Sequence, residues 1–178
     1  MNTLDAGRAV LEPQKASHAA EMVHVLADQA IYEFENAPPV SLAWLESRFA
    51  KLEAQYSADG TEQWLNWVIR QPSGELAGYV QASVTQESTA YIAYELASKF
   101  WRQGIGSSAV TAMLIELENT YSVRCFVAVF KARNLRSMAL LRSLGFDCEP
   151  PVQLTAVERG ADEAVMYKPS LFYKNLYA

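Results

Sequence analysis

The segment from Tyr91 to Phe146 limits the fold of this chain more than any other part of the sequence. Its pattern predicts a strand, a turn with two glycines, an amphipathic helix, a buried strand and a second helix. The glycines, Gly104 and Gly106, stand where the first helix begins. The first backbone N–H groups of a helix lack intrahelical acceptors and lie at the positive end of the helix dipole. We therefore expect an anion site at this turn, and phosphate is the usual ligand of such sites.

An antiparallel meander is expected to lead into the glycine turn, because the connections between its strands are too short for a crossover. Its three strands are predicted at 63–70, 76–85 and 91–97. Further upstream, residues 8–11 are typical of a first strand, and Ser17 and Ser41 are candidate N-caps of two helices. The apolar stripes of these helices are predicted at Met22, Val23, Leu26 and Ala30, and at Leu45, Phe49, Leu52 and Tyr56.

A second group of elements follows the glycine turn. Cys125–Phe130 is an unbroken apolar run, as expected for a strand that is covered on both faces. Asn134 is the predicted N-cap of the next helix, which Gly145 ends. Two prolines within 146–153 allow at most an interrupted edge strand there, and 164–168 predicts a last strand. The sequence therefore predicts an α+β fold with about four helices and a mixed, mostly antiparallel sheet of six or seven strands.

Length and composition fit one domain that spans residues 1–178, with 51% apolar residues for a core. The net charge of −5 gives no overall basic field, so we expect no nucleic-acid partner. No apolar run reaches the ~20 residues of a membrane span, and the N-terminus lacks a signal-peptide core. We expect a cytoplasmic monomer or homodimer that is not bound to a membrane. Cys125 and Cys148 predict buried thiols, with no disulfide and no metal site.

Three interpretations of the two glycines compete. The run Gly-Ile-Gly-Ser-Ser-Ala fits the dinucleotide-binding pattern, but six residues separate it from the preceding strand. The next strand also ends at Lys131 without a carboxylate that could hold a ribose. A P-loop requires a lysine that this turn lacks. A helix entry without any ligand is the third interpretation.

The surroundings of the turn favour a different phosphate ligand. The run Phe100-Trp101-Arg102-Gln103-Gly104-Ile105-Gly106 is followed by a helix, a buried strand, the pair Asn134-x-x-Ser137 and then Leu144-Gly145-Phe146. This order resembles the GCN5-related N-acetyltransferase (GNAT) family, and it is most similar to the ribosomal-protein-acetyltransferase-like branch. The resemblance implies a three-layer α/β/α fold, a sheet that splays at the cofactor site, and acetyl-CoA as cofactor.

The resemblance also implies roles for individual residues. Leu96 and Ala97 would pair with the pantetheine amides like an added strand, and Asn134 would hold the cofactor arm across the cleft. The backbone amides that would bind the pyrophosphate belong to Gln103, Gly104, Ile105, Gly106 and Ser107.

The sequence departs from the broader family at two positions. Trp101 replaces the usual first residue of the phosphate motif, and Leu141 replaces the tyrosine that protonates the thiolate in many members. Ser137 is therefore expected to face the thiol and act as the acid, with a purely structural role in the helix as the alternative.

The base that takes a proton from the amine is expected to be Glu95, either directly or through water. Strand alternation places Glu95 on the face opposite Tyr94 and Leu96. Two alternatives remain: a bulge in the strand could turn the Glu95 side chain into the cleft, or the side chain could point outward and form an ion pair. Glu87, at the preceding turn, is a rival for the same role.

The acceptor is expected to contact Tyr32, Glu33, Phe34 and Glu35, which suit a cationic amine such as a peptide N-terminus, a polyamine or an aminoglycoside. Core packing of the two aromatic residues is the alternative interpretation. The sequence as a whole predicts an acetyl-CoA-dependent N-acetyltransferase that acts on a primary amine by direct attack. A non-catalytic acyl-CoA-binding or interaction module is the alternative function, and a dinucleotide-dependent oxidoreductase ranks third.

Overall fold

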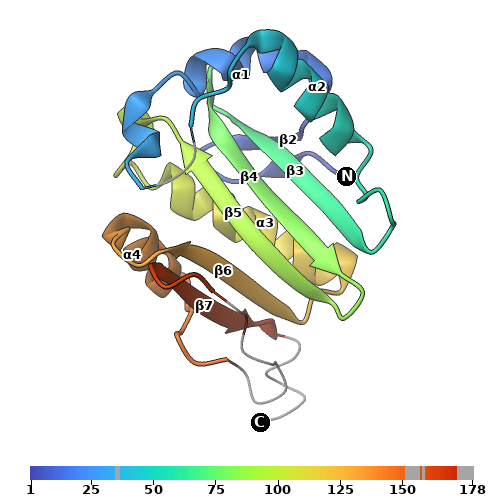
Figure 1. Ribbon diagram of the computed structural model, residues 1–178, viewed down its shortest axis with the longest axis vertical. Coiled ribbons are helices and arrows are strands. Elements are labelled where there is room, and N and C mark those ends of the chain that lie inside the picture. Colours follow the sequence, from blue (N-terminus) through green and yellow to red (C-terminus); the bar gives the residue numbers. More distant parts are fainter. Residues whose placement is uncertain (35–36, 151–156, 158, 172–178) are drawn as a thin grey trace.

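The computed structural model describes residues 1–34, 37–150, 157 and 159–171. These residues form a seven-stranded sheet, whose strands lie in chain order, between two layers of helices (Figure 1). The strands are β1 (Leu4–Asp5), β2 (Val10–Pro13), β3 (Glu62–Arg70), β4 (Leu76–Thr85), β5 (Thr89–Leu96), β6 (Cys125–Lys131) and β7 (Glu163–Pro169). The α-helices are α1 (Ala19–Val25), α2 (Leu42–Glu53), α3 (Ile105–Tyr121) and α4 (Leu135–Ser143). Short 3₁₀-helices are η1 (Ala16–His18), η2 (Gln29–Tyr32) and η3 (Ser98–Phe100).

The sheet is antiparallel except at one pair of strands. Strands β3, β4 and β5 form the predicted meander, and β6 and β7 are also antiparallel. Strands β5 and β6 run parallel and pair at only three positions, the last of which joins Tyr91 to Val127. Beyond this point the two strands diverge, although β5 continues to Leu96 and β6 to Lys131. The sheet therefore splays between β5 and β6, as predicted.

Each face of the sheet has its own helices and core. Helices α3 and α4 pack on one face, where Trp67, Phe126 and Leu141 are fully buried. Helices α1 and α2 pack on the other face, against Val68 and Leu76 of the meander. The structure is thus the predicted three-layer α/β/α arrangement, with α3 behind the sheet in Figure 1 and α1 and α2 in front.

The predicted first helix was wrong in its start and in its length. Ser17 lies inside η1, and α1 ends at Val25, so the predicted stripe residue Ala30 belongs to η2 instead. The chain leaves the helix because the Asp28 side chain accepts a hydrogen bond from the Ala30 amide and caps η2. Competition of this kind from a short polar side chain is not visible in apolar spacing.

The second predicted helix is correct in its N-cap but too long. Ser41 accepts a hydrogen bond from the Trp44 amide, as expected of a capping serine. The helix ends at Glu53, because Gln55 adopts a left-handed backbone conformation with φ of +63°. Tyr56 therefore leaves the predicted stripe and forms an isolated bridge with Gln63.

Smaller differences occur at the ends of the chain. The first strand begins two residues later than expected, and an unforeseen strand β1 pairs with it. Cys125 is buried as predicted, but Cys148 is exposed, because it follows α4 in a segment on the surface. In the predicted 146–153 segment, Asp147 makes an isolated bridge with Tyr167, and residues beyond 150 lie outside the described ones.

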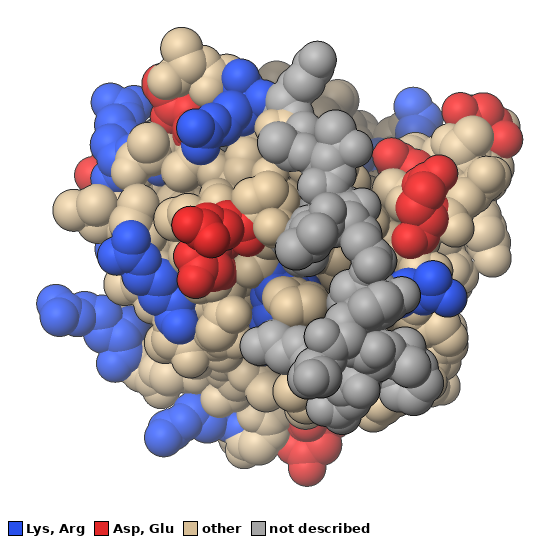
Figure 2. Space-filling model, turned by 90° about the horizontal axis from the view of Figure 1, so that it is seen from below, with Lys and Arg blue, Asp and Glu red and all other residues tan. Residues whose placement is uncertain are grey.

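The surface charge is mixed. On the face seen in Figure 2, the visible acidic side chains lie among the lysines and arginines. None of the helices described is both long and apolar enough to cross a membrane.

Candidate active site

The glycine turn that is predicted to bind an anion lies at the start of α3. Gly104 is the N-cap and has φ of +76°, a left-handed conformation that favours glycine. The first bond of the helix runs from the Ser108 amide to the Gly104 carbonyl (3.0 Å). Within the described residues, the backbone N–H groups of 103–107 donate to no acceptor. A helix of 17 residues lies behind these amides, so they have the geometry that the prediction of an anion site requires.

Arg8 lies beside this turn, although nothing in the sequence around Gly104 indicates it. It belongs to the turn between β1 and β2, and a Cβ atom on Gly104 would lie 3.2 Å from its Nε atom. The guanidinium therefore adds a positive charge next to the free amides. This contact depends on the order of strands in the sheet, so only the folded structure reveals it.

The edge of β5 faces the splay with backbone groups that β6 does not use. Ala97, which was expected to pair with the pantetheine, instead donates its amide to the Ala77 carbonyl on β4 (2.9 Å) and accepts the Phe100 amide at its carbonyl (2.9 Å). Because backbone groups alternate sides along a strand, those of Tyr94 and Leu96 face the gap. The Leu96 carbonyl accepts a hydrogen bond from Trp101 Nε1 (2.8 Å), which ties the glycine turn to the strand. The unusual Trp101 thus anchors the turn through its indole.

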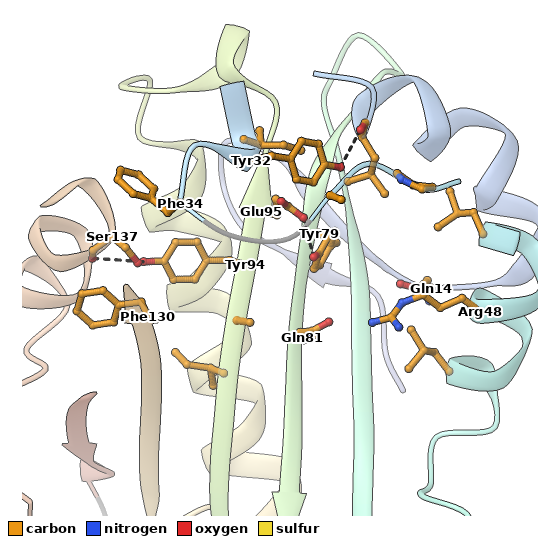
Figure 3. A pocket seen from close by; sticks show the side chains of 18 of the residues that line it. Gln14, Tyr32, Phe34, Arg48, Tyr79, Gln81, Tyr94, Glu95, Phe130 and Ser137 are labelled. Atoms are coloured by element: carbon orange, nitrogen blue, oxygen red, sulfur yellow. Dashed lines mark hydrogen bonds between the residues drawn. The ribbon is translucent and has the colours of Figure 1, made fainter. Parts of the chain in front are cut away.

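Asn134 and Ser137 lie across the gap from this edge. Asn134 Oδ1 accepts the Ser137 amide (3.0 Å) and caps α4 as predicted. Ser137 Oγ lies 2.6 Å from the hydroxyl of Tyr94 (Figure 3). Burial raises the pKa of Tyr94 to about 12, so its hydroxyl stays protonated at neutral pH. Tyr94 is a functional candidate that the sequence did not indicate, because its partner is on a helix that is distant in the chain.

A pocket of about 420 Å³ opens beside the splay. Both Glu95 and Ser137 line it. Its other polar lining residues include Gln14, Arg48, Tyr79, Gln81, Tyr94 and Asn134. Its apolar wall comes from η2 and the segment after it, from α2, and from β5 and β6.

Glu95 faces this pocket without any bulge in the strand. It pairs in regular register with Tyr79, whose hydroxyl donates to Glu95 Oε2 (2.7 Å; Figure 3). Gly78, next to Tyr79, allows this close approach, because a Cβ atom there would collide with the Glu95 backbone oxygen. The predicted alternation is correct, because Glu95 lies on the face of the strand opposite Leu96. That face lines the pocket, so no bulge is needed to bring Glu95 into it. Glu87 is exposed on the β4–β5 turn, at the other end of β5.

Only some of the residues that were predicted to contact the acceptor line the pocket. Tyr32 and Phe34 line the pocket, and the Tyr32 hydroxyl donates to the Leu26 carbonyl (2.7 Å). Glu33 is exposed and forms an ion pair with Arg136 of α4 (2.5 Å). Glu35 lies outside the described residues.

Two contacts hold this wall in place. The Ser98 amide donates to Asp28 Oδ2 (2.6 Å), which joins the start of η2 to the end of β5. Hydrogen bonds from the Ser98 side chain and then from its backbone amide lower the pKa of Asp28, so the carboxylate is charged at neutral pH. At the other end, the Arg136 guanidinium lies over the rings of Trp101 (4.4 Å) and Phe34 (5.2 Å). No group of three His, Cys, Asp or Glu side chains in the described part of the chain could hold a metal ion.

The fold and the site together define a class of protein. A mixed sheet that splays between two parallel strands, next to a helix entry with unused amides, is the architecture of an acetyltransferase domain, as the resemblance predicted. The acetyltransferase (GNAT) domain model matches residues 8–147, and the chain belongs to this family.

Solved structures with the same fold cover nearly all of the chain. A ribosomal-protein alanine acetyltransferase from Vibrio fischeri has 16% identity and a TM-score of 0.79, over 97% of this chain and 99% of that one. A ribosomal-protein α-N-acetyltransferase in complex with coenzyme A has 18% identity and a TM-score of 0.78, over 94% and 98%. A microcin self-immunity acetyltransferase in complex with acetyl-CoA and AMP has 19% identity and a TM-score of 0.74, over 92% and 93%. A comparison with curated proteins gives no match.

Proposed function

We propose that this protein transfers the acetyl group of acetyl-CoA to a primary amine by direct attack. The observation that carries the proposal is that Glu95 of β5 and Ser137 of α4 line the same pocket from either side of the splay. A base and an acid for one transfer would have to be placed in this way. The complexes of similar acetyltransferases with coenzyme A and acetyl-CoA support the choice of cofactor.

The residues present fit acetyl-CoA. The free amides of 103–107 and the Arg8 side chain would hold its pyrophosphate, and the gap-facing backbone of Tyr94 and the Leu96 amide would bind its pantetheine arm. Asn134 caps α4 with its oxygen, and in the described residues its Nδ2 atom makes no hydrogen bond, so it is available to the arm. When bound, the cofactor supplies a thioester that is activated toward amines.

The side chains of the pocket supply the proton transfers. Glu95 would accept a proton from the attacking amine, in the position that the Tyr79 hydrogen bond fixes. Ser137 Oγ would hold the proton that the departing thiolate needs, with the Tyr94 hydroxyl next to it. Direct attack requires no covalent enzyme intermediate, so no nucleophile is assigned.

A direct test incubates the protein with acetyl-CoA and a panel of peptides, polyamines and aminoglycosides and titrates the released thiol. Thiol release that depends on the amine supports the proposal. Coenzyme A binding by calorimetry without turnover on any amine would instead identify a non-catalytic acyl-CoA-binding module. The buried Leu141, at the usual position of the acid, motivates this alternative. Absence of coenzyme A binding would overturn both.

Replacement of Ser137 by alanine is expected to lower the turnover number about fivefold. The proposed proton donor is lost, but a thiol has a pKa of about 8.5, so its thiolate can leave without full protonation and the loss is smaller than the ~10²- to 10⁴-fold typical of a general acid. The affinity for coenzyme A should change by less than about twofold, since the α4 cap uses the backbone amide of residue 137 rather than its hydroxyl. Steady-state kinetics and calorimetry on the same preparation measure both values. Ser137 is structural if neither changes.

Replacement of Tyr94 by phenylalanine is expected to lower turnover by a similar factor of about five, because it removes the hydroxyl that contacts Ser137 Oγ. The Tyr94→Phe and Ser137→Ala double variant should be no slower than either single variant, since residues that act as one unit are not additive. Additive losses in this double-mutant cycle would contradict a shared role.

A further inference from the structure

A row of amide side chains crosses the pocket side of the sheet and has no part in the proposed reaction. Asn66 of β3 pairs with Gln81 of β4. Gln14 comes just after β2, and its backbone N–H donates to the backbone carbonyl of Asn66 (2.9 Å). Residues paired in this way share a face of the sheet. The three side chains therefore lie next to one another, on the face that carries Tyr79 and Glu95.

Two members of this row lack a partner although they are buried. Gln14 is 7% exposed and Asn66 is 6% exposed, yet Gln14 Nε2 and Asn66 Nδ2 make no hydrogen bond with the described residues. Buried polar atoms of native proteins are nearly always paired. Both atoms are N–H donors, so the group that completes the site must be an acceptor. Gln14 lines the pocket, where such a group could reach it.

Arg48 of α2 adds a full positive charge to the same end of the pocket. Figure 3 shows its guanidinium next to Gln14 and Gln81, which point into the pocket with it. Arg48 stacks on Trp44 (5.7 Å), and it forms no ion pair within the part of the chain that the structure describes. A guanidinium has donors only and matches the two oxygens of a carboxylate.

From this arrangement we propose that Arg48 and Gln14 form a subsite for a carboxylate of the acceptor, separate from the place where its amine meets Glu95. The acceptor is then an amine that carries a carboxylate, and this inference rests on the proposed function. Polyamines and aminoglycosides would present a further cation to Arg48 and are disfavoured.

The register of the strands sets the distance between amine and carboxylate. The amide row lies two residues along the strands from the Tyr79–Glu95 pair. Glu95 on β5 is one strand from Gln81 and three strands from Gln14, so the Arg48 guanidinium, which lies next to both glutamines, is about two strands from Glu95 (Figure 3). With ~3.3 Å per residue and ~4.8 Å between strands, Glu95 and this guanidinium are on the order of 10 Å apart. An extended chain of about three residues covers this distance. A peptide N-terminus followed by a carboxylate near the third residue, either a C-terminus or an acidic side chain, fits the pocket.

Calorimetry with the protein saturated with coenzyme A tests this proposal without turnover. The probes are trialanine with a free C-terminus, trialanine amide, and Ala-Ala-Glu amide. The free acid is expected to bind about fivefold more tightly than trialanine amide, as for a charge pair with an exposed guanidinium. Ala-Ala-Glu amide distinguishes a side-chain carboxylate from a C-terminal one. Equal affinity for all three probes, including no affinity for any, would overturn the carboxylate subsite.

Variants assign the effect to the subsite. Arg48→Met should abolish the preference for the acid, whereas Lys51→Met, which removes a charge from the same helix outside the pocket, should retain it. Gln14→Leu should weaken binding of the acid without lowering the melting temperature, because the lost N–H group has no partner within the described protein. Loss of the preference in Lys51→Met would indicate general charge rather than a site. Preferential binding of the free acid without acetylation of any probe would support the carboxylate subsite and contradict the proposed acetyltransferase activity.

Discussion

Replacement of Glu95 by glutamine is expected to lower the turnover number by ~10²- to 10³-fold, the lower part of the ~10²- to 10⁴-fold range that a general base contributes. Glutamine has nearly the same shape, and its side-chain oxygen can still accept the hydrogen bond of the Tyr79 hydroxyl. The pocket should therefore keep its form while the proton acceptor is lost. The affinity for coenzyme A should stay within about twofold, since Glu95 points to the face of β5 opposite the Leu96 side chain.

The matched control is Glu87→Gln, which removes a carboxylate from the exposed turn at the other end of β5. This variant should turn over like the unchanged protein. Initial rates of thiol release at saturating acetyl-CoA compare the three proteins, and thermal unfolding checks that each is folded. If Glu95→Gln keeps full activity, the proton leaves the amine by another path, such as a chain of water molecules.

Local signals in the sequence were sufficient to predict the elements that are proposed to hold the cofactor. A glycine turn before an apolar stripe, an unbroken apolar strand and an Asn-x-x-Ser pair each specify their own element, and the structure contains all of them. The parallel pairing of β5 with β6 then places these elements around one gap. Strand, helix and cap signals act over a few residues, which explains why they could be interpreted without the fold.

The other half of the site depends on contacts between distant segments. Arg8 reaches Gly104 from the first hairpin, and Tyr94 meets Ser137 across the splay. Alternation along β5 correctly placed Glu95 opposite Leu96, but it could not show that α2, η2 and the segment after η2 enclose that face into a pocket. The position of Gln14 next to Asn66 could not be predicted either, because it follows only from the order of the strands in the folded sheet.

Replacement of Gly104 by valine is expected to weaken coenzyme A binding tenfold or more, a cost of ~1.4 kcal/mol or above. The φ of +76° is unfavourable for a β-branched residue, so the turn must shift to accept valine. The new side chain would also press on Arg8, since a Cβ atom at this position lies 3.2 Å from Nε. Both changes displace donors that the pyrophosphate would use. Calorimetric titration with coenzyme A measures the loss.

Backbone strain alone could lower stability and thereby mimic a binding defect, so the control must carry the same strain elsewhere. Gly60 has φ of +72° and no atom within 4 Å of a Cβ position, and it lies on a turn far from α3 in the chain. Gly60→Val should lower the melting temperature to a similar extent and leave coenzyme A binding unchanged. Arg8→Met, which leaves the glycine turn intact, should weaken binding about threefold, and this loss should shrink at high salt. Unchanged affinity in folded Gly104→Val protein would exclude the turn as the pyrophosphate site, because no anion could bind equally well to amides that have moved.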